Sequence, residues 1–365
     1  MRRSDSTIPG WRIPPPLPAL AALCLVAAAP LPAAEPVAVK VVVAAMFENG
    51  ETTGDAPGEL QFWVERLALD TALPFPQGER ELYLNDDGVL AVLLGGGTAN
   101  ATASVMALGA DPRFDLRRAY WLIAGVAGGD PADLSLGSAA WAKHVVDGDL
   151  AYEIDAREIP ADWPYGMVPL GGTRPTDRPA DIYTGWTLDT ISFRLNAGLV
   201  DWAFELTKDV ELGDSEGIAA YRALFEGYPN AQRPPFVTIG DTLAASTYWH
   251  GRHLTTWAND WVHAYAGPDA NFMTSNMEDS GTLTALARLD RTGLVDVDRV
   301  LVLRTVSNYS MPPPGKTAQW SRTMPYPDGG RPALEAAFRV GNVVVQALLE
   351  GWADYAQHPP GAPPR

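Results

Sequence analysis

Four short segments carry residue types that could bind a small ligand or act on it, and each follows an apolar run. Glycine lets backbone N–H groups approach an anion, while Glu, Arg and Asn side chains can hold hydroxyl groups, water or a heterocyclic base. Because open α/β sheets bind ligands beyond the carboxyl ends of their strands, these segments predict a site. They are Met46-Phe47-Glu48, Gly95-Gly96-Gly97-Thr98, Gly125-Val126-Ala127-Gly128-Gly129 and Arg304-Thr305-Val306-Ser307-Asn308.

Two charged residues, Arg304 and Glu278, stand at positions where they could bind a ligand or form an ion pair. Arg304 lies in the otherwise apolar run 300–306, and a buried arginine needs either a carboxylate partner or a bound anion. Glu278, which precedes Gly281 and a predicted helix, could accept two hydrogen bonds from a cis-diol such as that of ribose. The alternative for Glu278 is an ordinary acidic residue at a helix N-terminus.

The aromatic run Tyr248-Trp249-His250 could stack on a planar base, although such clusters usually belong to the core. The five histidines do not form a zinc-binding pattern, and the sequence has no G-x-S-x-G nucleophile elbow. We therefore predict neither a metal ion nor another cofactor.

The charge of the chain excludes several classes of partner. It has 27 Lys and Arg against 44 Asp and Glu, a net charge of -17. Such an acidic protein repels nucleic acid and anionic membrane surfaces, and it does not attract free phosphate. Cys24 is the only cysteine, so the sequence after it holds no thiolate nucleophile and no disulfide.

Residues 1–34 have the composition of a secretory signal peptide. Arg2, Arg3 and Arg12 precede the apolar stretch 19–29, and small residues follow; the alternative is a Pro-rich extension. No later segment approaches 18 uncharged apolar residues. We expect an exported protein, periplasmic or secreted, that is not an integral membrane protein.

Strand and helix patterns alternate through residues 35–355, without a break in composition that would divide them. This predicts a single α/β domain with a central mixed sheet flanked by helices. Residues 160–190 favour a long loop, and the Pro-rich tail 356–365 favours disorder. The predicted strands are 37–46, 89–94, 119–124, 138–146, 236–239 and 300–306, and the predicted helices 60–69, 98–109, 195–207, 283–289 and 333–355.

Together the segments resemble the purine and uridine phosphorylase superfamily, which includes the methylthioadenosine and adenosylhomocysteine nucleosidases. Gly125 to Gly129 is similar to its G-x-x-G-G stretch, and Asn276-Met277-Glu278 to its Met-Glu ribose motif. Arg304 to Asn308 resembles the Arg-x-x-Ser-Asp segment that closes the active site. Within the superfamily, the chain after residue 34 resembles the purine nucleoside permease family, which implies a nucleoside-phosphorylase-like fold and a purine nucleoside ligand.

The resemblance also implies roles for individual residues. Glu278 would hold the ribose hydroxyls above Met277, and Asn308 would face purine N7, where Asn accompanies 6-oxopurines and Asp accompanies adenine. Glu48, which ends the run Ala45-Met46-Phe47-Glu48, would orient the attacking water with help from Arg304. The base would lie near Tyr248, Trp249 and His250, and the substrate loops would include Gly96, Gly97, Gly125, Ala127 and Gly128.

One position departs from the phosphorylase pattern. Ile123 stands where phosphorylases usually place an arginine that grips phosphate, and the first loop also lacks such an arginine. We therefore expect hydrolysis of the N-glycosidic bond. The first alternative is a non-catalytic nucleoside-binding protein that assists uptake with a membrane transporter partner; phosphorolysis ranks last. The sequence leaves open the preferred base and whether identical copies assemble.

Overall fold

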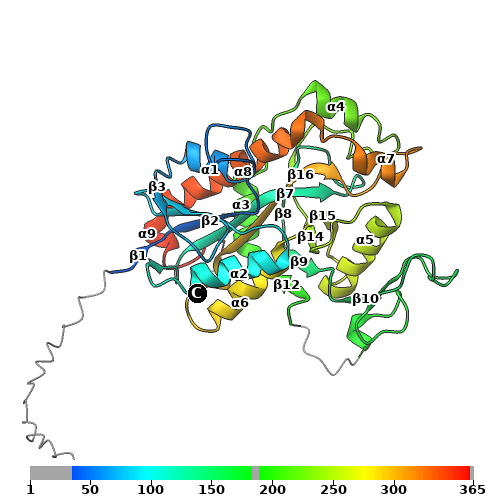
Figure 1. Ribbon diagram of the computed structural model, residues 1–365, viewed down its shortest axis with the longest axis horizontal. Helices are drawn as coiled ribbons and strands as arrows, with labels where there is room; N and C mark the ends of the chain where they lie inside the picture. The colour runs from blue at the N-terminus through cyan, green and yellow to red at the C-terminus, as the bar shows by residue number, and fades with distance from the viewer. Residues whose placement is uncertain (1–34, 183–188, 362–365) are drawn as a thin grey trace, which may run out of the picture. The chain divides into compact units, whose positions relative to one another are not determined.

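The computed structural model describes residues 35–182 and 189–361, and from Pro36 onward the chain forms one compact unit (Figure 1). The predicted signal peptide, with Cys24, lies outside the described residues. Within the described part, no helix is long and apolar enough to cross a membrane.

A large mixed sheet runs through this unit. Its main path is β12-β9-β14-β15-β7-β2-β5-β4-β3; β16 pairs with β7 and β8, and β8 pairs with β13. The strands of this sheet are β2 (Val41–Ala45), β3 (Thr71–Leu73), β4 (Leu82–Leu84), β5 (Val89–Leu93), β7 (Tyr120–Gly129), β8 (Ala139–Trp141), β9 (His144–Asp147), β12 (Ser192–Arg194), β13 (Val237–Ile239), β14 (Asp241–Ala244), β15 (Phe272–Asn276) and β16 (Val300–Tyr309). Two small sheets pair β1 (Val37–Ala38) with β6 (Phe114–Asp115), and β10 (Ala151–Glu153) with β11 (Met167–Pro169).

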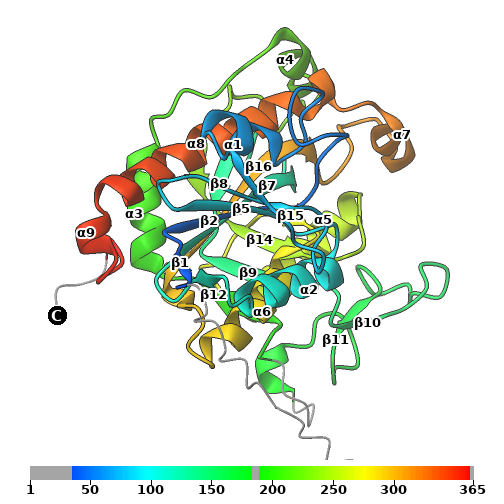
Figure 2. The same cartoon turned by 60° about the vertical axis from the view of Figure 1, so that its left-hand side comes forward.

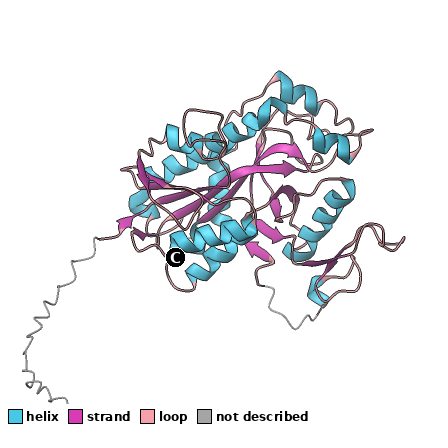
Figure 3. Ribbon diagram, in the orientation of Figure 1, coloured by secondary structure: helices cyan, strands magenta, loops and turns pink. Residues whose placement is uncertain are grey.

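Helices cover both faces of the large sheet (Figures 1 to 3). Helix α2 packs beside α6 on one face, while α8, with α1 and α3, covers the other. The α-helices are α1 (Gln61–Arg66), α2 (Thr98–Gly109), α3 (Ala197–Thr207), α4 (Glu216–Arg222), α5 (Arg252–Ala266), α6 (Asp279–Asp290), α7 (Ala318–Thr323), α8 (Arg331–Glu350) and α9 (Trp352–Tyr355). Short 3₁₀ turns are η1 (Pro179–Asp181), η2 (Val297–Arg299) and η3 (Pro327–Gly330).

The core lies along the central strands. Every residue of β2 and β5 is buried and apolar, as expected for parallel strands covered on both faces by helices. The predicted α/β architecture, a mixed sheet flanked by helices, is confirmed.

Two predicted loops are in fact strand. β7 continues through Gly125 to Gly129, and β16 through Asn308, because the two strands pair in parallel with Arg304 opposite Gly125. A Cβ atom on Gly125 would lie 2.6 Å from Nη1 of Arg304, so the glycine is required to make room for that side chain. The chain also stays packed beyond the predicted boundary at 355: Ala356 is buried and Gly361 lies against the backbone of helix α3, while residues 362–365 lie outside the described part.

Candidate functional site

The candidate site lies where the parallel strands β2, β5, β7 and β16 reach their carboxyl ends. The turn after β5 and the residues after β15 meet there, since the N–H group of Gly97 donates to Oε1 of Glu278 over 3.3 Å. Gly97 has a φ of 90°, a backbone conformation that favours glycine, and it directly precedes helix α2. The structure thus brings together the glycine segments and the Met-Glu segment that the sequence analysis singled out.

Arg304 is 1% exposed and is held by an acidic partner. Its Nε donates to Oδ2 of Asp279 over 3.0 Å, its Nη2 bonds to Oδ1 of Asp279, and its Nη1 donates to the carbonyl of Val126 over 3.1 Å. Of the two interpretations left open for Arg304, the ion pair is confirmed. Asp279 is fully buried at the start of α6, and sequence reasoning missed it because many carboxylates could have served.

Glu278 points into the site and does not cap a helix. It precedes α6, yet its side chain makes no capping hydrogen bond. Its two oxygens instead accept the N–H groups of Gly97 and Met277, and Oε2 lies 3.6 Å from Nη2 of Arg304. Burial raises the pKa of Glu278, and the charge of Arg304 opposes this rise. Glu278 thus stands at the N-terminus of α6, as the alternative expected, but its carboxylate bonds to Gly97 and Met277 and not to the first turn of the helix.

A second buried carboxylate, Glu59, completes the polar floor of the site. Its Oε2 accepts the N–H group of Met46 over 2.7 Å, and its Oε1 accepts that of Val126 over 2.6 Å. Burial raises the pKa of Glu59 to about 7, Arg304 lowers it and the charge of Glu278 raises it further. Such a group changes its protonation state near neutral pH, which suits an acid or base in catalysis.

Sequence reasoning missed Glu59 and favoured Glu48. The carboxylate of Glu48 accepts the N–H groups of Gly58, Leu60 and Gln61 at the start of α1, so its hydrogen bonds organise the loop and the helix terminus. The position beside Arg304 and Val126 belongs to Glu59. In the sequence, Glu59 is marked only by its place directly before Leu60, the residue that precedes helix α1.

Asn308 and Tyr248 form the opposite side of the site. Nδ2 of Asn308 donates to the hydroxyl of Tyr248 over 3.0 Å and to the carbonyl of Tyr309 over 3.1 Å. Gly128 lies beneath this amide, because a Cβ there would be 3.3 Å from Nδ2. His250 lines the same small hollow, and burial followed by the charge of Arg322 lowers its pKa.

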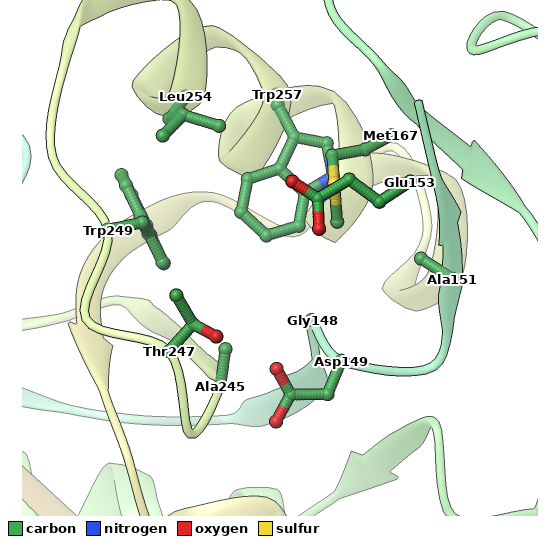
Figure 4. Close-up of a pocket in the computed structure, with 10 residues that line it drawn as sticks. All are labelled: Gly148, Asp149, Ala151, Glu153, Met167, Ala245, Thr247, Trp249, Leu254 and Trp257. Atoms are coloured by element: carbon green, nitrogen blue, oxygen red, sulfur yellow. The ribbon is translucent and has the colours of Figure 1, made fainter. Parts of the chain in front are cut away.

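Trp249 does not join these residues. Its neighbours Tyr248 and His250 line the hollow beside Asn308, whereas Trp249 lines a separate cavity (Figure 4). This tryptophan cavity is bordered by Gly148, Asp149, Ala151, Glu153, Met167, Ala245, Thr247, Trp249, Leu254 and Trp257. The sequence analysis grouped Trp249 with Tyr248 and His250; the structure separates Trp249 from them, because successive residues of this segment face opposite sides.

The remaining predicted positions surround the polar floor. Met277 is half-buried and adjoins Glu278, Gly96 accepts a hydrogen bond from Asn100 through its carbonyl, and the carbonyl of Ala127 accepts one from Ser307. Ile123 is fully buried in the middle of β7. Residues 35–182 and 189–361 contain no group of three His, Cys, Asp or Glu side chains that could hold a metal ion.

Comparisons with solved structures confirm the predicted fold. The methylthioadenosine/adenosylhomocysteine nucleosidase of Campylobacter jejuni superposes with a TM-score of 0.51 at 15% identity, covering 86% of this chain and 99% of that chain. Futalosine hydrolase of Helicobacter pylori gives a TM-score of 0.51 at 13% identity, covering 85% of this chain and 98% of that chain. These likenesses establish a nucleosidase-like fold.

Comparisons of sequence give the family. A purine nucleoside permease of Candida albicans is 32% identical over 269 residues, 72% of this chain and 64% of the relative. A Schizosaccharomyces pombe protein named as a probable purine nucleoside permease is 35% identical over 222 residues, 59% of this chain and 62% of the relative. The chain thus spans less than two thirds of the length of these relatives. Residues 38–360 match the purine nucleoside permease family, and the chain belongs to that family.

Proposed function

We propose that this protein binds purine nucleosides and hydrolyses their N-glycosidic bond to free base and ribose. The observation that carries the proposal is the pair of buried carboxylates, Glu59 and Glu278, placed beside Arg304 at the strand ends. Cleavage of this bond requires a carboxylate to position water and groups that hold the sugar and the departing base.

Glu278 binds the sugar in this proposal. Its oxygens already accept the N–H groups of Gly97 and Met277, which fix the carboxylate, and each oxygen retains a lone pair for a ribose hydroxyl. Burial raises the pKa of Glu278, and the charge of Arg304, which Asp279 holds in place, opposes this rise and favours the carboxylate form. Met277, half-buried beside Glu278, packs under the sugar ring.

Glu59 acts on the water. In its carboxylate form it accepts a proton from water as the water oxygen bonds to C1′ and the bond from C1′ to the base nitrogen breaks. The electron pair of that bond leaves with the purine, which takes a proton from solvent, and Glu59 returns its proton to solvent. A pKa of about 7 keeps a substantial share of Glu59 ionised at neutral pH.

Asn308 and Tyr248 receive the base. The amide Nδ2 of Asn308, now bonded to the hydroxyl of Tyr248, donates to purine N7 and stabilises the negative charge on the departing base. His250 borders the same hollow and, with its lowered pKa, faces the base as a neutral ring.

Phosphorolysis has little support at this site. Asp279 already accepts hydrogen bonds from Nε and Nη2 of Arg304, and Glu278 lies 3.6 Å from Nη2, so carboxylates balance the charge of the guanidinium before phosphate could bind. Ile123 supplies an apolar side chain within the sheet, at the position where phosphorylases usually carry their arginine.

A second candidate is a nucleoside-binding protein that assists uptake without turnover. The names of the fungal relatives favour it. Within the described residues no helix could span a membrane, so uptake would rest on a separate membrane transporter. The export expected from residues 1–34 belongs to this candidate as well as to the hydrolase.

One assay distinguishes the two candidate functions. Inosine, guanosine and adenosine are incubated with the full chain, with and without phosphate, and the sugar product is identified. The hydrolase gives free ribose at a rate that phosphate does not change. Ribose 1-phosphate would contradict hydrolysis, and tight binding without any product would establish the uptake candidate.

A further inference from the structure

The tryptophan cavity is separate from the polar floor of the nucleoside site. Its volume is about 170 Å³, several times the ~30 Å³ that one water occupies in the liquid, so it can hold a small organic molecule. None of the residues that line it belongs to the strand-end cluster of Glu59, Glu278 and Arg304. Nothing in the proposed hydrolysis uses it.

Two indole rings form adjoining walls of this cavity. The rings of Trp249 and Trp257 lie 5.6 Å apart between centroids and are inclined by 76° (Figure 4). Leu254 and Trp257, three residues apart on α5, present the same face of the helix, and Met167 projects from β11. Parallel rings would sandwich a flat base, whereas rings at nearly a right angle form the corner of an aromatic cage, which suits a compact, rounded group.

Two carboxylates face the same space. Figure 4 shows the carboxylate of Glu153 beside the ring of Trp257 and that of Asp149 at the other end of the cavity, beside Ala245. Asp149 is fixed in place, since its Oδ2 accepts the N–H group of Ser246 over 2.7 Å. Glu153 lies directly across the small sheet from Met167, so the strand pairing places both at the rim.

The lining contains no cationic side chain: among its ten residues there is no Lys, Arg or His. The electron-rich faces of two indoles, a thioether and two negative charges therefore converge on one volume. Each of these groups attracts a positive charge, and the net charge of -17 adds a long-range attraction of the same sign.

We propose that the tryptophan cavity is a second ligand site that takes a small organic cation, a quaternary ammonium or a protonated alkylamine. The cation lies in the corner between Trp249 and Trp257, and Asp149 and Glu153 balance its charge. The segment 246–250 separates this site from Asn308: Tyr248 and His250 face the nucleoside side, and Thr247 and Trp249 face the cavity.

Calorimetric titration of the full chain with choline tests the proposal. The matched probe is 3,3-dimethylbutan-1-ol, which has the same shape with a neutral carbon in place of the charged nitrogen. We expect choline to bind at least about tenfold more tightly than the alcohol, the scale of a cation–π contact supported by carboxylates. Equal affinities for the two probes would overturn the proposal.

Variants locate the binding. Glu153→Gln should weaken choline about threefold to tenfold, whereas the control Glu158→Gln, which removes the same charge from an exposed position of the same segment, should leave it unchanged. Trp249→Leu should remove the preference for choline over the alcohol. If Glu158→Gln weakens choline as much as Glu153→Gln does, the attraction is only the overall charge of the protein and the site is rejected.

A competition experiment tests whether the tryptophan cavity instead holds a purine base. Saturating inosine should leave choline binding intact, and Trp249→Leu should leave inosine binding intact. Displacement of choline by inosine, together with weaker inosine binding in Trp249→Leu, would make the cavity part of the nucleoside site and overturn the proposal. Because choline binding is measured without turnover, its failure is distinct from a failure of the hydrolase proposal.

Discussion

The two sides of the candidate nucleoside site are built in opposite ways. The sugar side, so called for its proposed ligand, consists of Glu59, Glu278 and the Arg304–Asp279 pair; these side chains are ionisable, and all four residues are below 8% exposed. The base side consists of Asn308, His250 and Tyr248; these side chains are uncharged or lose charge easily, and Tyr248 is 40% exposed.

This difference predicts that the sugar side is rigid and that the base side tolerates substitution. Buried charges on the sugar side are held by strand backbone and by α6, so moving any of them leaves a partner uncompensated in a medium of low dielectric constant. The base side relies on neutral hydrogen bonds near solvent, which cost less to rearrange. We therefore expect substitutions on the sugar side to have large effects and those on the base side small ones.

The largest effect is expected for Glu59→Gln. Removing the ionisable carboxyl group should lower the turnover of inosine by roughly 10² to 10⁴, the usual contribution of a positioned acid or base, with little change in affinity. In the wild type, turnover should rise as the pH passes through about 7, because the carboxylate form is required. The measurement is release of free base as a function of pH.

Glu48→Gln is the contrasting variant for that prediction. Its carboxylate accepts backbone N–H groups at the start of α1, so we expect a loss of about 1 kcal/mol in the free energy of unfolding and a far smaller loss of turnover. If Glu48→Gln abolished turnover and Glu59→Gln did not, Glu48 would be the group that acts on the water.

Asp279→Asn should cause the largest loss of stability. It leaves the guanidinium of Arg304 buried without its carboxylate, which costs roughly 3 to 5 kcal/mol in the free energy of unfolding. Asp155→Asn, which breaks the exposed pair with Arg157, is the control and should change little. Similar midpoints of denaturant unfolding for both variants would show that the sugar side is not the rigid one.

Glu59 also predicts a pH dependence of stability. Its folded pKa of about 7 lies above the ordinary value of 4.5, so the stabilisation from its protonated form is complete below pH 4.5 and is lost as the pH rises through about 7. Relative to Glu59→Gln, the wild type should lose up to about 3 kcal/mol between pH 4.5 and pH 8. If the free energy of unfolding depends on pH in the same way for both proteins, Glu59 does not have a raised pKa in the folded state, and the prediction is wrong.

Glu278→Gln tests the binding of the sugar. We expect inosine and guanosine to bind roughly 10- to 100-fold more weakly, because hydrogen bonds to a charged acceptor are each worth about 1.5 to 3 kcal/mol. The free bases should bind almost as before. Calorimetry that shows equal losses for a nucleoside and its base would remove Glu278 from the sugar side.

The smallest effect is expected for Asn308→Asp on the base side. The carboxylate no longer donates to Tyr248, and the preference should move from 6-oxopurine nucleosides toward adenosine by about 1 kcal/mol, roughly fivefold. The measurement is the ratio of affinities for inosine and adenosine. A change as large as that of Glu278→Gln would mean that the two sides do not differ in the way described.

Local patterns were sufficient to predict most of the fold. The apolar runs 37–46 and 89–94 contain the buried strands Val41–Ala45 and Val89–Leu93, because burial on both faces requires a continuous apolar sequence, whereas Val37–Ala38 form the separate, exposed strand β1. The helices at 98–109 and 195–207 follow from their spacing and flanking residues. The ends of β7 and β16 could not be predicted, since glycine usually ends a strand and only the neighbouring strand shows that Gly125 makes room for Arg304.

The sequence by itself determined the residue types of the site and the segments that carry them, because motif order and strand ends are local properties. Only the tertiary structure decided which side chains meet. The path of the loop 47–60 selects Glu59 over Glu48, helix α6 supplies Asp279 to Arg304, and the segment 246–250 turns Trp249 away from Asn308. Each of these depends on contacts between residues far apart in the chain, which no spacing along the sequence encodes.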